Sequence, residues 1–316
     1  MRIVIPGGSG QVGTILARAF HADGHDVVVL SRSPRPRPWR VVSWDAATPG
    51  RWTREIDGSD VVINLAGRSV NCRYTERNRK EIMDSRVVPT QLIGEIIGHA
   101  ARPPRAWLQA STATIYAHRL DGANDEATGR IGGQEPGAPS TWRFSIDVAT
   151  RWEQTLTEAV TPQTRKVALR SAVTMSPDPG GIFDTLVGLV RKGVGGTAGD
   201  GRQYVSWIHY DDFVRVVRWL IAHEEIDGVV NVAAPHPLTN AEFMRILRDA
   251  MGIRVGLPAT RWMLELGARL MGTETELVLK SRRVVPGRLL GAGFTFRFPD
   301  WPEAARNLAY EWRARR

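Results

Sequence analysis

The chain opens with Ile3-Val4-Ile5-Pro6-Gly7-Gly8-Ser9-Gly10-Gln11-Val12-Gly13, and this stretch decides its fold. The β-branched residues predict a short buried strand, and apolar residues at helical spacing from Val12 to Phe20 predict a helix directly after it. The glycines between them fit both G-x-x-G-x-x-G and G-x-G-x-x-G. Glycines in this context let the backbone approach a pyrophosphate, to which the helix N-terminus presents free N–H groups. The turn therefore predicts a dinucleotide site, formed by Gly7, Gly10, Gln11, Val12 and Gly13, with an ordinary glycine-rich turn as the alternative.

The end of the second predicted strand indicates which dinucleotide binds. Residues 27–30 form a buried apolar run, and Ser31-Arg32-Ser33 follows it. An NAD site usually carries an acid here to bind the ribose 2′-OH, whereas an arginine suits a 2′-phosphate. This strand end has no Asp or Glu, and Arg35 and Arg37 add positive charge nearby. We therefore predict that Ser31, Arg32 and Ser33 bind NADP(H); the alternative is a solvated loop arginine.

Strand and helix patterns alternate through the first half of the chain. Apolar runs predict strands at 41–42, 61–65, 107–111 and 167–170. Helices are predicted over 85–100, where Pro89 must start or kink the helix, and over 148–158. This alternation is typical of parallel βαβ units, so the predicted fold class is α/β with a Rossmann-type doubly wound parallel sheet. At the end of the 61–65 strand, small residues predict a close approach of the cofactor to Leu65, Ala66 and Gly67, although helix packing also favours small residues there.

The pattern changes near Ser176. Turn-rich stretches at 176–181 and 193–201 are followed by a strand at 229–233 that is expected to return to the sheet. Further helices are predicted at 213–221, 240–251, 260–271 and 302–308. The expected organisation is an NADP(H)-binding domain over 1–175 and a smaller, mostly helical substrate lobe made mainly from 176–316.

The composition restricts the class of protein. The 316 residues, 42% of them apolar, are enough for a sizeable core. No apolar run approaches the roughly 18 residues of a membrane span, and the first strand leaves no room for a signal peptide. A single cysteine, Cys72, cannot form an internal disulfide, so the expected compartment is the cytoplasm. The net charge of +9 comes from scattered arginines without interleaved aromatic residues, so we expect neither a nucleic-acid nor a membrane partner, and no metal site.

From end to end, the chain resembles the extended short-chain dehydrogenase/reductase superfamily. It is most similar to the atypical epimerase-family branch, which is NAD-dependent epimerase/dehydratase-like and carries a C-terminal domain of unknown function. The matching stretches are Gly7–Gly13, Val62–Gly67, Ser111–Tyr116, Trp152-Glu153, Gly199–Asp212, Asn231–Phe243 and Pro286 with Gly293–Phe296. The resemblance implies an oxidoreductase or isomerase with a small-molecule substrate, and a homodimer formed through helices that flank the sheet.

The superfamily's catalytic groups are only partly present. Its members use Ser or Thr with Tyr-x-x-x-Lys, often with an Asn. Thr112 stands at the Ser/Thr position, and Ser111 beside it is implied to meet the cofactor. The Tyr and Lys positions fall on Phe144 and Val148 or on Ser145 and Ala149, and neither pair can replace them. Arg86 takes the place of the Asn, where it could bind the cofactor or an anionic substrate.

Two other residues could supply the missing acid–base group. Tyr116 follows Thr112 by four residues and should lie near the nicotinamide end, although a packed aromatic with a solvated hydroxyl is an equal alternative. His209 could act as an acid or base, but a histidine in such a place more often supports a loop. Asp212 is expected to cap the helix that follows.

The substrate side also departs from the superfamily. Nucleotide-sugar enzymes hold a diphosphate with an arginine four residues before this histidine, where the chain has Val205. Arg202 is a candidate to compensate, as are Arg282 and Arg283, but the simpler inference is that the substrate is no nucleotide sugar. The tryptophans that could line an apolar substrate pocket are Trp142, Trp207 and Trp262.

Two functional hypotheses follow. The first is an NADP(H)-dependent oxidoreductase or epimerase-like enzyme in which Thr112 polarises the reacting oxygen and an unconventional acid, or water, replaces the tyrosine. The second is a non-catalytic NADP(H)-binding protein that senses redox state or regulates a partner. The absent Tyr and Lys favour the second hypothesis, whereas the retained substrate-side stretch at 199–212 favours the first.

Overall fold

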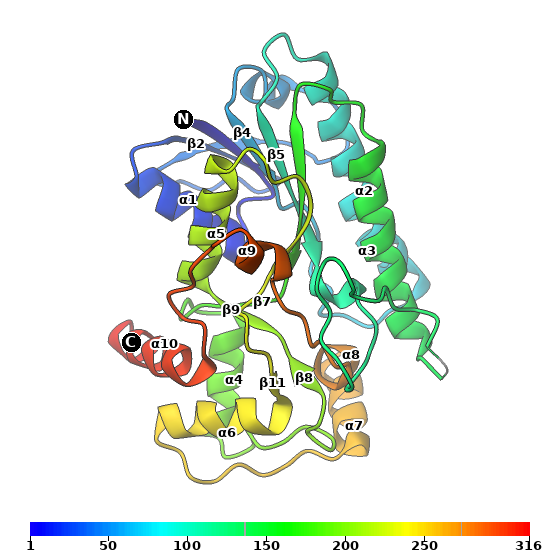
Figure 1. The fold of residues 1–316 in the computed structure, drawn as a ribbon, viewed down its shortest axis with the longest axis vertical. Coiled ribbons are helices and arrows are strands. Elements are labelled where there is room, and N and C mark those ends of the chain that lie inside the picture. The colour runs from blue at the N-terminus through cyan, green and yellow to red at the C-terminus, as the bar shows by residue number, and fades with distance from the viewer. Residues whose placement is uncertain (136, 273) are drawn as a thin grey trace.

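A sheet of seven parallel strands organises the chain (Figure 1). The computed structural model describes residues 1–135, 137–272 and 274–316. Within these residues the strand order is β10-β6-β5-β4-β1-β2-β3. The strands are β1 (Arg2–Pro6), β2 (Asp26–Ser31), β3 (Arg40–Ser43), β4 (Val61–Asn64), β5 (Ala106–Thr112), β6 (Arg165–Ser171) and β10 (Gly228–Val232). The predicted doubly wound parallel sheet is confirmed, including the strand expected near 41–42.

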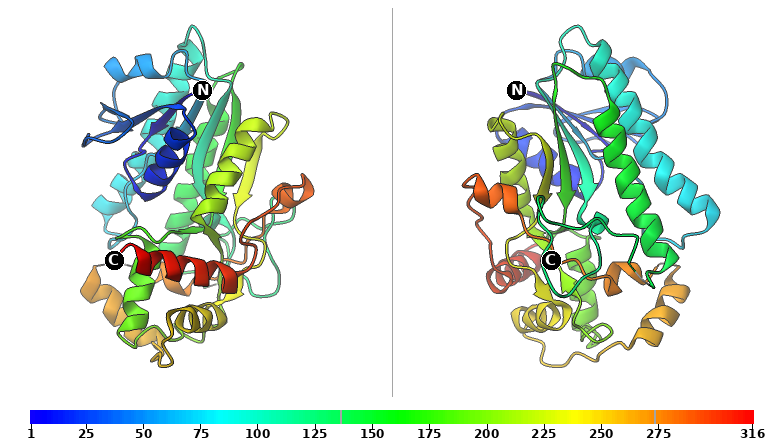
Figure 2. Two further views of the ribbon diagram at one scale, coloured as in Figure 1. Left: turned by 90° about the vertical axis from the view of Figure 1, so that its left-hand side faces the viewer. Right: turned by 45° about the vertical axis from the view of Figure 1, so that its right-hand side comes forward.

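Alternating side chains on the strands bury both faces of the sheet. Ile3 and Ile5 face the layer of α1 (Gln11–Ala22) and α5 (Tyr210–Ala222), whereas Val4 faces the layer of α2 (Glu76–His99) and α3 (Ser140–Glu158). Figure 2 shows α2 and α3 side by side along their face of the sheet. Each fully buried aliphatic side chain of this kind stabilises the fold by about 1.5–3 kcal/mol.

The strand order reverses at β1, which lies between β2 and β4. Ligands of open α/β sheets bind outside the carboxyl ends of the strands at such a reversal. The glycine-rich turn follows the carboxyl end of β1, and Ser31 and Leu65 stand at the corresponding ends of β2 and β4. The topology thus brings three separately predicted segments to one edge.

The second lobe is built from short strand pairs and helices (Figure 1, lower part). β7 (Val173–Met175) pairs with β9 (Trp207–His209), and β8 (Tyr204–Val205) pairs with β11 (Leu238–Thr239). Around them lie α4 (Ile182–Arg191), α6 (Asn240–Met251), α7 (Arg261–Met271), α8 (Glu276–Leu279) and α10 (Trp301–Ala314), whereas α9 (Gly287–Gly291) packs on β10 of the main sheet. Two 3₁₀ turns, η1 (Arg51–Glu55) and η2 (Ala113–Ile115), belong to the sheet domain. None of the helices in the described ranges has the length and apolar character needed to cross a membrane.

Several helices are longer than the sequence predicts. α2 begins at Glu76 rather than near 85, because Thr75 caps it by accepting a hydrogen bond from Asn78 N at 3.3 Å. Pro89 lies inside α2 instead of starting it, and buried Leu92 and Ile93 anchor the following turn against the sheet. α3 and α10 also extend beyond the predicted 148–158 and 302–308, because their ends pack through residues outside the strongest apolar repeat.

Candidate functional site

The glycine-rich turn is held against β4 by backbone packing. Gly7 has φ +72°, and a Cβ added there would lie 2.7 Å from Ala66 Cα. A Cβ on Gly13 would lie 2.4 Å from Gly8 Cα, so larger residues are excluded from both positions. Gly10 is the N-cap of α1 and supplies no side-chain cap, which leaves the first N–H groups of the helix for a ligand. The turn therefore has the geometry that a pyrophosphate requires.

A cleft of about 700 Å³ opens in front of this turn. It is lined by Gly7, Ser9, Gly10, Ser31–Ser33, Trp44–Ala47, Leu65–Arg68, Glu81, Asp84, Ser85 and Val88. The volume is in the range of cofactor sites. Most of the predicted cofactor residues meet here, among them Arg32 and the run Leu65-Ala66-Gly67. Gln11, Val12 and Gly13 are not among the residues that line the cleft, and Gly13 packs on Gly8.

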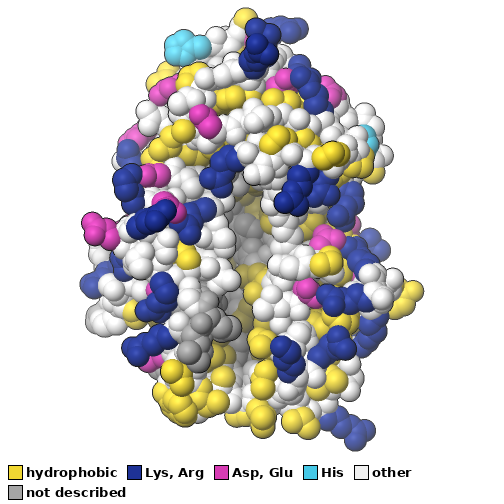
Figure 3. All heavy atoms as spheres, turned by 180° about the vertical axis from the view of Figure 1, so that it is seen from behind, with side chains coloured by type: hydrophobic (Ala, Val, Ile, Leu, Met, Phe, Trp, Pro, Cys, Tyr) yellow, Lys and Arg dark blue, Asp and Glu magenta, His cyan; other side chains and the backbone are white. Residues whose placement is uncertain are grey.

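A neighbouring hollow of about 240 Å³ shares Ser9, Ser31 and Ser33 with the cleft. Arg35 and Arg37 line it, so three arginines surround the end of β2. Ser31 Oγ accepts a hydrogen bond from Ser33 N at 3.2 Å, which fixes the turn between them. Seen from behind, the molecule is hollowed along a groove flanked by dark-blue Lys and Arg side chains (Figure 3). Such a charge distribution favours a ligand that carries phosphate groups.

A smaller pocket of about 240 Å³ lies beyond the cleft, at the carboxyl end of β5. The loop after β4 connects the two, because Gly67 and Arg68 line the cleft and Val70 and Tyr74 line the pocket. The apolar part of its wall consists of Val70, Tyr74, Ile82, Phe144, Val148 and Trp152. The polar part consists of Arg86, Ser111, Thr112, Thr114, Ser145, Glu276 and Arg282. A small molecule with an apolar body and one polar group would fit this division.

Thr112 lies at this polar end. Its Oγ1 accepts a hydrogen bond from Thr114 N at 3.1 Å and so caps the turn η2. A hydroxyl that accepts one hydrogen bond keeps its own proton for donation. Thr112 therefore caps this turn and also lines the pocket.

Arg86 lies at the pocket and not in the cofactor cleft. Its guanidinium donates to Ile82 O at 3.0 Å and to Arg68 O at 3.1 Å, and it lies over the Trp152 ring at 5.2 Å. Burial lowers the pKa of Arg86 to about 10. The side chain ties the loop after β4 to α2 and shapes the pocket wall, and its contact with the cofactor or an anionic substrate stays a prediction.

Ser111 is part of a buried network behind the pocket. Its Oγ donates to Glu153 Oε1 at 2.5 Å, and Glu153 is paired with Arg170 of β6. Arg170 donates onward to the Tyr116 hydroxyl at 2.9 Å, which in turn donates to Asn231 Oδ1 at 2.9 Å. The network joins α3, β5, β6 and β10 beneath the site.

Tyr116 is therefore corrected from a candidate acid to a structural residue. Only 1% of its surface is exposed, and its hydroxyl is held by Arg170 and Asn231. Burial raises the pKa of its hydroxyl, which opposes a role as a base at neutral pH. It is not among the residues that line the pocket.

His209 is corrected in the same way. Its Nδ1 accepts from Asp211 N at 3.1 Å as the cap of α5, and its Nε2 is 3.0 Å from Asn307 Oδ1. Burial lowers its pKa to about 4. Asp212 does not cap the helix: its carboxylate accepts from Arg297 N and Phe298 N, both at 2.8 Å.

The residues predicted to contact substrate are dispersed. Trp207 is fully buried and packs on Trp301 with ring centroids 4.9 Å apart. Trp142 lies against His118, and Trp262 is 65% exposed on α7. Arg202 is exposed in a turn whose backbone binds Asp200. None of these four residues lines the pocket. For the tryptophans, the prediction failed because aromatic residues occur in cores and pockets alike, and the sequence does not distinguish the two.

Four pocket residues with polar groups were not predicted from the sequence to line it. Two of them were not singled out at all, and two were considered for another role. Tyr74 and Glu276 carried no motif, whereas Ser145 was considered only as a position where Tyr is missing. Arg282 was considered for a diphosphate and instead lines the small pocket. Glu276 comes from the short helix α8, and no local pattern could have placed it against α3.

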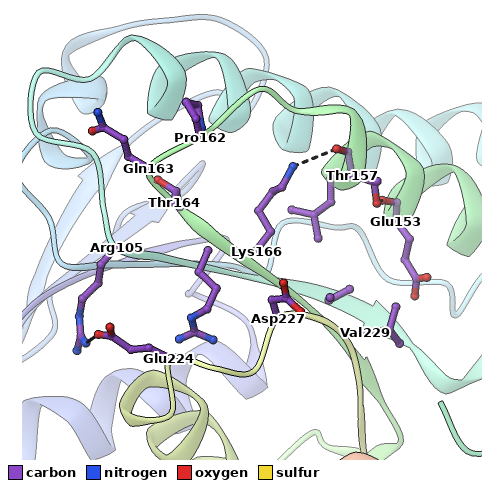
Figure 4. A pocket seen from close by; sticks show the side chains of 14 residues that line it. Arg105, Glu153, Thr157, Pro162, Gln163, Thr164, Lys166, Glu224, Asp227 and Val229 are labelled. Atoms are coloured by element: carbon purple, nitrogen blue, oxygen red, sulfur yellow. Dashed lines mark hydrogen bonds and ion pairs between the residues drawn. The ribbon is translucent and has the colours of Figure 1, made fainter. Parts of the chain in front are cut away.

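Another cavity, of about 710 Å³, lies at the opposite edge of the sheet (Figure 4). Arg165, Lys166 and Gly228 mark it as the edge where β6 and β10 begin. Its basic side chains already have partners: Arg105 pairs with Glu224 at 2.5 Å, and Lys166 donates to Thr157 O at 3.0 Å. Because ligands of such sheets bind at the carboxyl ends of the strands, this cavity is not the site.

Comparisons with known proteins match the chain over almost its whole length. The model of the NAD dependent epimerase/dehydratase family matches residues 3–233, and a domain of unknown function matches residues 259–308. The human epimerase family protein SDR39U1 is 30% identical over 312 residues, covering 98% of this chain and 99% of its own length. Epimerase family protein YfhF of Bacillus subtilis is 28% identical over 313 residues and 98% of both chains.

Solved structures give the same picture. The crystal structure of human SDR39U1 (isoform 2) with NADPH has a TM-score of 0.83 and 29% identity, and the match covers 98% of this chain and 99% of that one. The nucleoside-diphosphate sugar epimerase from Corynebacterium glutamicum has a TM-score of 0.75 and 28% identity, over 98% of this chain and 58% of that one.

Proposed function

Because the chain belongs to the NAD dependent epimerase/dehydratase family, we propose that it is an NADP(H)-dependent oxidoreductase or epimerase-like enzyme for a small molecule. The observation that carries this proposal is the continuity of the two cavities along one loop. Gly67 and Arg68 line the dinucleotide cleft, and Val70 and Tyr74 line the pocket that contains Thr112. A dinucleotide in the cleft would thus have its reactive end beside a pocket for a second molecule.

NADP(H) is supported by the residues around the end of β2. Arg32 lines the cleft beside Ser31 and Ser33, with Arg35 and Arg37 in the adjoining hollow. This basic set suits a 2′-phosphate, and the human relative was crystallised with NADPH. When bound, the nicotinamide supplies hydride chemistry. The protein's part is to orient the substrate and to polarise its reacting oxygen through Thr112.

The pocket supports a substrate smaller than a nucleotide sugar. Its volume of about 240 Å³ is below the usual range for drug-sized ligands. Val205 pairs with β11 and supplies no positive charge for a diphosphate. The substrate class that fits is a small carbonyl compound or alcohol with a partly apolar body.

A non-catalytic NADP(H)-binding protein is the second candidate. Phe144 and Val148 occupy one of the two register positions of the missing Tyr and Lys, and they are buried in a cluster with Ile82. These side chains can neither donate a proton nor hold a positive charge. The second candidate would bind NADP(H) through the same cleft without turnover.

The nucleotide that copurifies with the protein provides the first test. Release from the purified protein and mass spectrometry should identify NADP⁺ or NADPH, and titration should show tighter binding of NADPH than of NADH. Recovery of NAD(H) alone would contradict the role of Arg32.

Turnover separates the two candidates. With NADPH and a panel of small ketones and aldehydes, Thr112→Ala should lower kcat by about 10²-fold or more, because one donor to the reacting oxygen is lost. Thr112→Ser is the matched control, since it keeps the hydroxyl. Equal turnover by wild type and Thr112→Ala would remove Thr112 from the mechanism, and NADPH binding without any turnover would favour the second candidate.

The sequence also supports two proposals, one about the oligomeric state and one about the cellular compartment. A homodimer through helices that flank the sheet predicts a molar mass of twice 35.0 kDa by light scattering. The lone Cys72 supports a reducing compartment such as the cytoplasm.

A further inference from the structure

A buried carboxyl group lines the small pocket. Glu276 of α8 is 1% exposed, and its Oε2 accepts a hydrogen bond from Ser145 Oγ at 2.5 Å. Its Oε1 is buried and has no hydrogen-bond partner among the residues that the structure describes. An unpartnered oxygen in a buried carboxyl is unfavourable unless a proton or a ligand occupies it. Glu276 therefore has a carboxyl oxygen that is free to bind a proton or a ligand at the wall of the small pocket.

Side chains from separate elements hold this carboxyl in place. Ser145 Oγ of α3 lies 3.4 Å from the Tyr74 hydroxyl, so that Tyr74, Ser145 and Glu276 form a line of exchangeable protons. Arg282 donates to Thr114 Oγ1 at 3.1 Å and to Glu276 O at 3.4 Å, which fixes the backbone of α8 against η2. Preorganisation of this kind is what an acid–base group needs.

The surroundings favour the protonated form of the carboxyl. Burial raises the pKa of Glu276, and the charge of Arg282, the hydrogen bond from Ser145 and the charge of Lys280 only partly oppose it, with Glu274 acting in the same direction as burial. Burial also raises the pKa of Tyr74, which keeps its hydroxyl neutral. A raised pKa makes a carboxyl a better proton reservoir for a general acid that gives up a proton and takes it back.

We propose that Glu276 is the acid–base residue of the pocket, replacing the Tyr that α3 lacks, and that its substrate is a small carbonyl compound or the corresponding alcohol. This inference rests on the proposed oxidoreductase function. In reduction, the proton leaves the Glu276 carboxyl and forms an O–H bond with the substrate oxygen. That oxygen holds the electron pair released from the C=O bond as the nicotinamide hydride reaches the carbon. Glu276 is left as a carboxylate, and the reverse direction restores its proton.

The proposal gives the C-terminal region a chemical role. Glu276 lies within residues 259–308, which match a domain of unknown function. α3 contributes Ser145, which occupies one of the two possible positions of the missing Tyr. α8 contributes Glu276, whose carboxyl accepts a hydrogen bond from this serine. The reacting group would thus come from the substrate lobe and not from the sheet domain.

The first experiment measures the protonation of Glu276 and needs neither cofactor nor substrate. Infrared difference spectra between wild type and Glu276→Gln should show a protonated-carboxyl C=O band in the wild type at neutral pH. The exposed control Glu303→Gln should keep this band. A carboxyl that is already ionised at neutral pH would overturn the inference.

The second experiment measures proton delivery, with acetophenone as a small aromatic ketone and NADPH as the reductant. Glu276→Gln should lower kcat by about 10²- to 10⁴-fold while the NADPH Kd stays unchanged, because the acid is lost and the cleft is intact. Glu276→Asp, which retains a carboxyl, should recover part of the rate. Wild-type turnover by Glu276→Gln would overturn the inference.

Two further readouts keep this inference separate from the proposed function. Ser145→Ala removes the partner of Glu276 and should shift the pH profile of kcat without removing the acid, even if Glu276→Gln fails to fold. A wild type that does not bind NADPH, or that reduces no ketone, would contradict the proposed function. The acid–base role would fall with it, and the infrared band would then show only whether the Glu276 carboxyl carries a proton.

Discussion

Arg170 of β6 forms a bidentate ion pair with Glu153 of α3, in which Nε lies 2.8 Å from Oε1 and Nη2 lies 2.7 Å from Oε2. The two side chains are 11% and 12% exposed, and the same carboxylate accepts the Ser111 hydroxyl. Since Ser111 adjoins Thr112 at the end of β5, the ion pair positions the wall of the small pocket from behind.

Breaking this pair should be costly. Glu153→Gln leaves the Arg170 charge buried without its counter-ion, so we expect the free energy of unfolding to fall by about 3 kcal/mol. The matched control is Glu158→Gln on the same helix, whose pair with Arg151 at 3.5 Å is about half exposed. That change should cost at most about 0.5 kcal/mol. Urea denaturation of both variants measures the difference, and equal losses would show that the buried pair contributes no more than a surface pair.

The glycine-rich turn could be predicted because its signal is local. The close approach of Gly7 to Ala66 and the positive φ of Gly7 require glycine in one short stretch, and the neighbouring strand and helix are visible in the residue pattern. The position of Ser31, Arg32 and Ser33 at the cleft could be predicted for the same reason, since they lie at the end of a recognisable strand. These two local signals were enough to predict the parallel sheet and the edge of it at which the cofactor cleft lies.

The substrate side could not be predicted in this way. Glu276 meets Ser145 only through the packing of α8 on α3, and neither residue belongs to a local motif. Trp207 and His209 stand in a recognisable stretch, yet burial in the second core decides their role. A sequence pattern gives the chemical type of a side chain but not which side of a strand faces a cavity.

Arg32 should determine cofactor selectivity. Arg32→Ala removes one charged donor from the cleft, and a charge-assisted hydrogen bond is worth about 1.5–3 kcal/mol, so the NADPH Kd should rise by about 10- to 100-fold. The NADH Kd should stay near its wild-type value, because NADH has no 2′-phosphate. Arg40→Ala, at the amino end of β3, has the same charge change outside the cleft and is the control. Parallel weakening of both cofactors by Arg32→Ala would argue against 2′-phosphate recognition.

Gly13 should tolerate no side chain. The added methyl of Gly13→Ala meets the backbone of Gly8 at 2.4 Å, so the turn must shift, with a loss of about 1–3 kcal/mol in stability and of most NADPH affinity. The control is Gly188→Ala in α4, where a Cβ meets no atom within 4 Å among the described residues. This change should stabilise the protein by up to about 1 kcal/mol, because alanine is the better helix former. Thermal unfolding and fluorescence titration measure both effects, and unaltered NADPH binding by Gly13→Ala would contradict the tight cradle.

His209 should make the protein acid-sensitive. Burial lowers its pKa from 6.5 to about 4, partly opposed by its hydrogen bond with Asn307. Between these two values the unfolded chain binds a proton that the native state does not, so stability must fall as the pH falls from about 6.5 to about 4. The full difference corresponds to about 3 kcal/mol.

The variant His209→Asn isolates this effect. Asparagine still accepts the cap hydrogen bond from Asp211 N, but it loses the stacking on Phe298, whose ring centroid lies 4.0 Å away. The variant should therefore be less stable than the wild type at neutral pH, and its deficit should shrink by about 3 kcal/mol as the pH falls to about 4, because it has no imidazole to protonate. Denaturation midpoints measured at several pH values give both curves, and NMR of the His209 ring gives its pKa directly. Curves that stay parallel through this range would mean that the His209 ring is protonated in the native state and that its burial does not limit stability in acid.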